Sequence, residues 1–114
     1  MLACRSRAKA LAAADSIKSV FPEATCVCPQ SPLELGDLAS VAVFAAEIKS
    51  TVPNLCGLVL CAGIDGAPET RTPQGNELHM SVNHLGHMLL TAVCPMEGGG
   101  GWSRGGRGRG RGRG

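Results

Sequence analysis

The chain has 114 residues, which is enough for one folded domain and too few for two of ordinary size. Its formal net charge is +2, but five of its eleven basic residues lie at positions 104–114, so the part up to Glu97 carries six basic and nine acidic residues. This mildly acidic body gives no reason to expect a nucleic-acid partner, and no stretch of the sequence is apolar enough to cross a bilayer.

The chain has six cysteines, and their placement indicates the redox state of its cellular compartment. The first five lie inside or beside apolar runs, which predicts buried free thiols and a reducing compartment. These five are Cys4, Cys26, Cys28, Cys56 and Cys61, and Cys94 is the sixth. The pair at positions 26 and 28 lacks the two-residue spacer of a zinc site, so we expect no metal.

The first twenty residues bear on targeting. No apolar stretch precedes Cys4, so we expect no signal peptide. Residues 5–20 mix basic residues with alanine and serine, as transit peptides do, but Asp15 and a helical pattern explain this stretch better. We therefore expect a cytoplasmic or organellar protein.

Helices and strands are expected to alternate from the start of the chain. A short apolar stretch at 1–4 precedes a predicted helix at 6–21, which Pro22 ends. Residues 24–28 are rich in β-formers and predict a strand. Asp37 is placed to cap a second helix. The apolar stripe of that helix contains Leu38, Val41, Phe44, Ala45 and Ile48.

The same alternation continues after Pro53. Residues 55–61 are apolar throughout and bounded by turn residues, which predicts a strand buried on both faces. A long loop at 62–76 leads to a third predicted helix at 77–93. Strands that alternate with helices of this length predict an α/β domain with a parallel sheet.

Polar residues interrupt the third predicted helix. Its apolar stripe consists of Leu78, Val82, Leu85 and Leu89, and we expect the helix face that carries this stripe to be buried. Within that helix lies Asn83, flanked by three histidines at positions 79, 84 and 87. These side chains either face water, bind a metal, or serve chemistry beside the helix. No carboxylate or cysteine is placed to complete a metal site.

The composition changes abruptly after Met96. Residues 98–114 are almost entirely glycine and arginine, too polar to offset the entropy of ordering, so we expect a disordered tail. The predicted units are a domain at 1–96 and a tail at 97–114. Arginine-glycine repeats attract RNA weakly, with Trp102 alone available for stacking; the alternative is an appendage with no selected role.

Four ordered stretches resemble the short-chain dehydrogenase/reductase family, in the branch of retinol-dehydrogenase-like and protochlorophyllide-reductase-like enzymes. They are ACR at 3–5, LELGDLASV at 33–41, LVLCAGI at 58–64 and VNHLGH at 82–87. The resemblance implies part of a Rossmann-like, doubly wound parallel sheet, with its second to fourth strands and their helices. It also implies an NAD(P) cofactor and a carbonyl or alcohol substrate.

The resemblance assigns three residues to the adenosine end of the cofactor. Arg5 falls where the family places an arginine after its second strand, and a guanidinium there suits a 2′-phosphate, so NADP is the expected cofactor. Glu34 stands where the family has an aspartate that accepts a hydrogen bond from the adenine amine. Leu35 would line the adenine pocket.

Three further assignments concern the loop after the fourth strand and the helix beside it. Ala62 and Gly63 match the end of the family's Asn-Asn-Ala-Gly turn, although Leu60 and Cys61 replace the two asparagines. Asn83 matches the catalytic asparagine, which in the family holds a water that relays protons toward a lysine and a tyrosine.

Two parts of the family's machinery are missing from these 114 residues. The 114 residues contain no glycine-rich phosphate-binding turn. They also contain no tyrosine, so the family's Tyr-x-x-x-Lys pair is absent from them. The expectation is therefore a fragment of an NADP-dependent oxidoreductase that does not turn over substrate by itself. The alternative is an interaction protein that docks on a full-length relative, as a homo- or heterodimer, through the helix at 77–93.

Overall fold

The computed structural model describes residues 1–52 and 54–94. The predictions for the tail, namely its disorder, its RNA binding and the domain boundary near Met96, lie outside the described residues. Three helical stretches account for the regular structure: α1 (Arg7–Val20), α2 (Leu38–Thr51) and a composite third stretch. The third consists of α3 (Leu78–Met80), the π-helical turn η1 (Ser81–Leu85) and α4 (Gly86–Val93). All three lie where the sequence predicts helices.

Helix α2 is fixed at its start by side chains from two parts of the chain. Asp37 caps it, as predicted, by accepting a hydrogen bond from the Ala39 amide at 3.0 Å. Gln74 reaches in from the 62–76 loop, donating to Asp37 at 2.8 Å and accepting from the Leu38 amide at 3.2 Å. The Gln74 hydrogen bond is the main reason that the pKa of Asp37 lies below its ordinary value. This loop is therefore anchored to α2.

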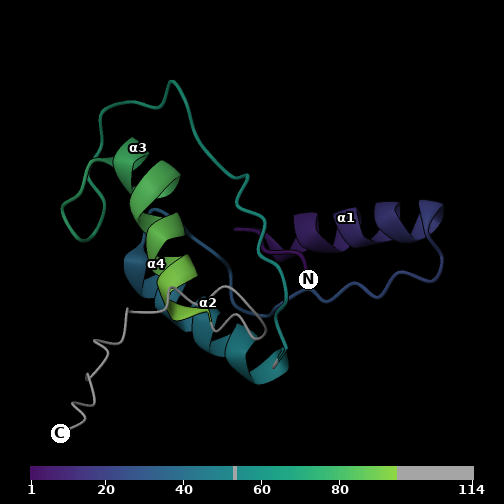
Figure 1. The fold of residues 1–114 in the computed structure, drawn as a ribbon. Helices are drawn as coiled ribbons and strands as arrows, with labels where there is room; N and C mark the ends of the chain where they lie inside the picture. The colour runs from purple at the N-terminus through teal and green to yellow at the C-terminus, as the bar shows by residue number, and fades with distance from the viewer. Residues whose placement is uncertain (53, 95–114) are drawn as a thin grey trace, which may run out of the picture.

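The hydrophobic core lies between α2 and the third helical stretch, which pack against each other (Figure 1). Phe44 and Val41 are 1% and 0% exposed, so the predicted stripe of α2 does face inward. The core cluster comprises Leu33, Leu35, Val41, Phe44, Ala45, Ile48, Val82, Leu90 and Cys94. Helix α1 lies apart from this pair and buries only Ala10 and Ala14.

The segments predicted as strands run as irregular chain. No β-strand forms within residues 1–52 and 54–94, although an isolated antiparallel bridge joins Arg71 and Glu77. The start of the chain lies beside residues 27–33, because the Leu2 amide donates to the Val27 carbonyl at 2.9 Å and the Cys4 carbonyl accepts from the Leu33 amide at 3.1 Å. The doubly wound parallel sheet stays a prediction.

The prediction that the first five cysteines are buried is wrong, because none of them is fully buried: Cys4, Cys26 and Cys28 are half-buried. All six thiols are free, and Cys94 is buried in the core. Cys56 and Cys61 are exposed, in a segment at 55–61 where only Leu55 and Leu58 are half-buried. An apolar run predicts burial only where a neighbouring element covers both of its faces.

The third helical stretch buries a different face from the predicted one after Val82. The Gly86 amide donates to the Ser81 carbonyl five residues back, so the turn between them holds one residue more than an α-turn. Burial therefore moves from the expected positions 85 and 89 to Gly86 and Leu90. Leu85 and Leu89 are only half-buried.

Across the described residues, none of the helices combines the length and the apolar character needed to traverse a lipid bilayer.

Glu77 makes the start of the third helical stretch sensitive to pH. Its carboxylate accepts hydrogen bonds from the amides of His79 at 3.0 Å and Met80 at 2.8 Å, and the first of these is the main reason that its pKa falls from 4.5 to about 2. Because the folded state favours the charged form, the cap stabilises the fold above pH 4.5, and this contribution is lost as the pH falls toward about 2.

Glu77→Gln should therefore lower the thermal unfolding temperature at pH 7 and have little effect near pH 2. Thermal unfolding of wild type and variant across this range measures the difference. Glu69→Gln, in the preceding loop, is the matched control, and its effect should be small at every pH. A Glu77→Gln effect that stays constant down to pH 2 would contradict this role for the carboxylate.

Candidate functional site

The five residues predicted to contact the cofactor line a single cavity of about 540 Å³. Arg5, Glu34, Leu35, Ala62 and Gly63 come from three segments far apart in the sequence, and the apolar side chains of Leu33, Ile64, Leu78 and Val82 complete the wall. The structure thus brings together every residue that the resemblance assigned to the cofactor.

The segment carrying Glu34 and Leu35 is held by α2. The carboxylate of Glu47 accepts hydrogen bonds from the amides of Gln30 at 2.6 Å and Ser31 at 2.8 Å. The Ser40 hydroxyl accepts from the Glu34 amide at 3.1 Å. Helix α2 therefore fixes the direction in which this segment passes the cavity.

The charged side chains of the cavity lie at its rim. The side chain of Arg5 is 71% exposed, and its guanidinium lies 4.0 Å from a carboxylate oxygen of Glu34, whose side chain is 42% exposed. The other carboxylate oxygen accepts from the Gly36 amide at 3.1 Å. Leu35, by contrast, is 5% exposed. The cavity therefore offers a cation and a carboxylate at its rim above an apolar wall.

Gly86 allows the third helical stretch to approach the Leu35 backbone. A β-carbon built on Gly86 would lie 2.6 Å from the Leu35 carbonyl oxygen and 3.1 Å from its α-carbon. Such distances are shorter than van der Waals contact, so only glycine fits at this position without a shift of the backbone. Gly86 therefore brings the helix into direct contact with the cavity wall at Leu35.

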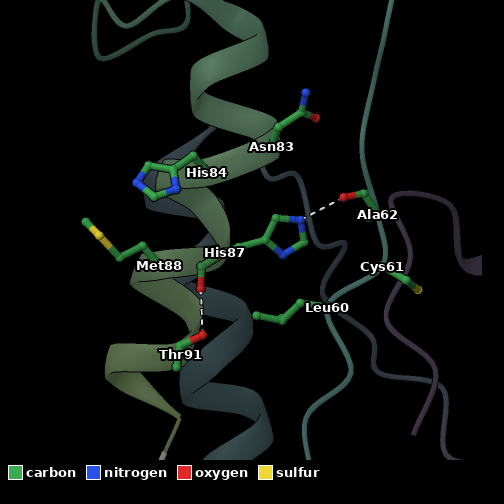
Figure 2. A pocket seen from close by; sticks show the side chains of 8 residues that line it. All are labelled: Leu60, Cys61, Ala62, Asn83, His84, His87, Met88 and Thr91. Carbon is green, nitrogen blue, oxygen red and sulfur yellow. Dashed lines mark hydrogen bonds between the residues drawn. The ribbon is translucent and has the colours of Figure 1, made fainter.

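Asn83 pairs with the backbone of the 60–64 segment. Its Oδ1 accepts from the Ile64 amide at 2.8 Å, and its Nδ2 donates to the Ile64 carbonyl at 2.9 Å. Figure 2 shows the side chain leaving the helix toward this segment. It lines a cavity of about 390 Å³ that adjoins the first and shares Cys61 and Ala62 with it. The asparagine therefore joins helix to loop, and its amide keeps one donor and one acceptor position for another partner.

His87 makes a second link to the same segment, which sequence reasoning missed. Its Nε2 lies 2.8 Å from the Ala62 carbonyl oxygen (Figure 2). Because a carbonyl only accepts, Nε2 carries the proton, and the buried Nδ1 has no hydrogen-bond partner among the described residues. The spacing of four between Asn83 and His87 places both side chains on one helix face, but it does not indicate which segment they contact. His84 and Met88 point away from the segment in Figure 2.

The histidines form no metal-binding constellation in the part of the chain that the structure describes. No group of three histidine, cysteine, aspartate or glutamate side chains is arranged there to hold an ion. His79 instead contacts the carboxylate of Glu77, with its Nδ1 2.8 Å from Oε1. The π-helical turn centred on Asn83 remains the unusual feature of this helix, and such turns occur frequently at functional sites.

Curated proteins from several organisms are similar to most of the chain. A WW domain-containing oxidoreductase of Drosophila melanogaster is 41% identical over 91 residues, which cover 80% of this chain and 22% of the relative. The short-chain dehydrogenase/reductase bet4 of Neocamarosporium betae is 40% identical over 96 residues, covering 81% and 28%. Retinol dehydrogenase 14 of Mus musculus is 35% identical over 99 residues, covering 80% and 30%.

The chain belongs to the short-chain dehydrogenase/reductase family. Retinol dehydrogenases among the relatives support the branch that the sequence motifs indicated. The chain spans less than a third of the length of the short-chain dehydrogenase/reductase relatives named above. No family model matches the chain, and no solved structure matches it.

Proposed function

We propose that the chain forms the adenosine end of the nicotinamide-cofactor site of a short-chain oxidoreductase that interconverts an alcohol and a carbonyl. One observation carries this proposal: Arg5, Glu34, Leu35, Ala62 and Gly63 line one cavity. An adenine ring would lie against the Leu35 wall, and the small residues Ala62 and Gly63 would let the ribose approach the backbone.

The charge at the rim supports NADP over NAD. Arg5 is held to Glu34 only by a contact of 4.0 Å between exposed groups, which contributes little energy. Its guanidinium is therefore available for a 2′-phosphate, which it would bind through charge-assisted hydrogen bonds. Glu34 keeps one carboxylate oxygen on the Gly36 amide and would offer the other to the adenine amine.

Of the residues that carry out the chemical step in the family, we assign only the asparagine to this chain. We place Asn83 in its family role, holding a water through the donor and acceptor positions that Ile64 leaves free. The 114 residues contain no tyrosine to donate the proton, so we expect no hydride transfer from NADPH to a carbonyl substrate by the chain alone.

Binding of adenosine 2′,5′-bisphosphate, compared with adenosine 5′-monophosphate, tests the proposal by calorimetry. Wild type should prefer the bisphosphate. Arg5→Gln should weaken bisphosphate binding at least about tenfold, since a hydrogen bond between charged groups contributes about 1.5 to 3 kcal/mol, and should leave monophosphate binding unchanged.

Arg71→Gln is the matched control, because it removes the same charge from a side chain that donates to the Gly75 carbonyl in the loop. It should not change either affinity. Equal affinity of wild type for the two nucleotides would sink the NADP assignment, and no binding of either would sink the site.

A further inference from the structure

A serine that the proposed nucleotide site does not use lies on the segment that leads into it. The sequence PQSP at 29–32 is the pattern that mitogen-activated protein kinases prefer, with proline two residues before Ser31 and directly after it. Ser31 is half-buried and its neighbours Gln30 and Pro32 are exposed, while Pro29 is buried. Thr72 also precedes a proline, but it is only 7% exposed. Of these two hydroxyls, Ser31 is therefore the one that a kinase can reach more easily.

Ser31 is bound to helix α2 through Glu47. A hydrogen bond with the Ser31 side chain is the main reason that the pKa of the Glu47 carboxyl lies below its ordinary value. The same carboxylate accepts hydrogen bonds from the amides of Gln30 at 2.6 Å and Ser31 at 2.8 Å. A phosphate in place of the hydroxyl proton would put a charge of about −1.5 to −2 beside this carboxylate. Repulsion between the two anions would separate the segment from α2.

Two arginines line a pocket of about 230 Å³ together with Ser31. Arg7 donates to the backbone carbonyls of Cys28 at 3.4 Å and Pro29 at 3.2 Å, which carry no net charge, so its own charge is available for an anion. Arg5 lines both this pocket and the proposed nucleotide cavity. A phosphate on Ser31 would therefore compete with a nucleotide 2′-phosphate for the same guanidinium.

We propose that a proline-directed protein kinase phosphorylates Ser31, and that the phosphate moves this segment from Glu47 to the two arginines and so weakens nucleotide binding. In the reaction the Ser31 Oγ forms a bond to the γ-phosphorus of ATP, and the bond from that phosphorus to the bridging oxygen breaks. The hydroxyl proton passes to a base of the kinase, and ADP leaves. The effect on nucleotide binding rests on the proposed function, whereas the release of the segment from Glu47 does not.

Incubation of the full chain with a mitogen-activated protein kinase and Mg²⁺-ATP tests the site. Mass spectrometry of peptides should locate one phosphate, on Ser31, and Thr72 is the internal control that should stay unmodified. Ser31→Ala should take up no phosphate, and Pro32→Ala should be phosphorylated about tenfold more slowly, since the residue after the serine is part of the recognised pattern. Absence of phosphate from Ser31, or equal rates for wild type and Pro32→Ala, would overturn the proposal.

Hydrogen exchange on the phosphorylated chain tests the structural consequence. The amides of Gln30 and Ser31 should exchange about fivefold faster or more than in the unmodified chain, because Glu47 no longer accepts from them. The Ala39 amide, which Asp37 accepts from, is the matched control and should not change. Unchanged exchange at Gln30 and Ser31 would overturn the proposal, whether or not the chain binds a nucleotide.

Two further measurements follow the arginines. By phosphorus NMR, the phosphate should ionise at a lower pH in wild type than in Arg7→Gln, because a nearby guanidinium favours the dianion. Equal ionisation in the two chains would overturn the part assigned to the arginines. Adenosine 2′,5′-bisphosphate should bind the phosphorylated chain about fivefold more weakly or worse, and equal binding would overturn the regulation. If the unmodified chain binds no nucleotide, the proposed function fails, and the exchange rates still decide the release of the segment.

Discussion

Gly86→Ala should lower the free energy of unfolding by about 1 to 3 kcal/mol, the range typical of overpacked sites. Helix propensity alone would predict the opposite, because alanine is more favourable than glycine inside a helix by about 1 kcal/mol. A steric contact makes the expected change destabilising instead. The new methyl would lie 2.6 Å from the Leu35 carbonyl oxygen, which belongs to the backbone and has no rotamer to change. Urea unfolding followed by circular dichroism measures the loss.

Gly57→Ala is the matched control for this substitution. A β-carbon at Gly57 meets no atom within 4 Å, so the free energy of unfolding should change by less than about 0.5 kcal/mol. Gly86→Ala should also weaken nucleotide binding, because Leu35 would have to move. A Gly86→Ala variant as stable as wild type would show that the helix does not pack against the cavity wall in this way.

Asn83→Leu should loosen the 62–64 segment and lower the free energy of unfolding by about 1 to 2 kcal/mol. Leucine has a similar volume but replaces neither the bond from the Ile64 amide nor the bond to its carbonyl, and each contributes about 0.5 to 1.5 kcal/mol. Hydrogen exchange measured at the Ile64 amide is the most local readout, and it should become at least fivefold faster.

Two further variants separate pairing from other roles of the helix. Asn83→Asp still accepts from the Ile64 amide but cannot donate to the carbonyl, so its exchange rate should fall between those of wild type and Asn83→Leu. His84→Ala, on the neighbouring exposed position, should leave the Ile64 amide unchanged. Equal exchange at Ile64 in wild type and Asn83→Leu would remove the structural role of this asparagine.

The helices were predictable because their signals are local. Apolar spacing identified the stripe of α2, and Asp37 identified its start. The π-helical turn at Ser81–Leu85 was not predictable in this way, since the stripe read from Leu78 through Leu89 assumes a constant helical period. One extra residue in that turn moved burial to Gly86 and Leu90.

Contacts between distant segments account for the rest of what the sequence did not predict. The pairing of Asn83 with Ile64, and of His87 with Ala62, depends on where a loop passes a helix, which spacing along one element does not encode. The exposure of Cys56 and Cys61 has a similar origin, because burial depends on a neighbour and not on the apolar run alone. Family motifs, in contrast, indicated Arg5, Glu34, Leu35, Ala62 and Gly63, and these five residues line one cavity, whose ligand stays a proposal.

The most direct test of the central proposal is to map adenosine 2′,5′-bisphosphate on the chain by amide chemical shifts. The proposal predicts that the largest changes occur at Arg5, Leu35 and Gly63, three residues brought to one cavity from distant parts of the sequence. Changes confined to α1, or spread evenly over the surface, would contradict it.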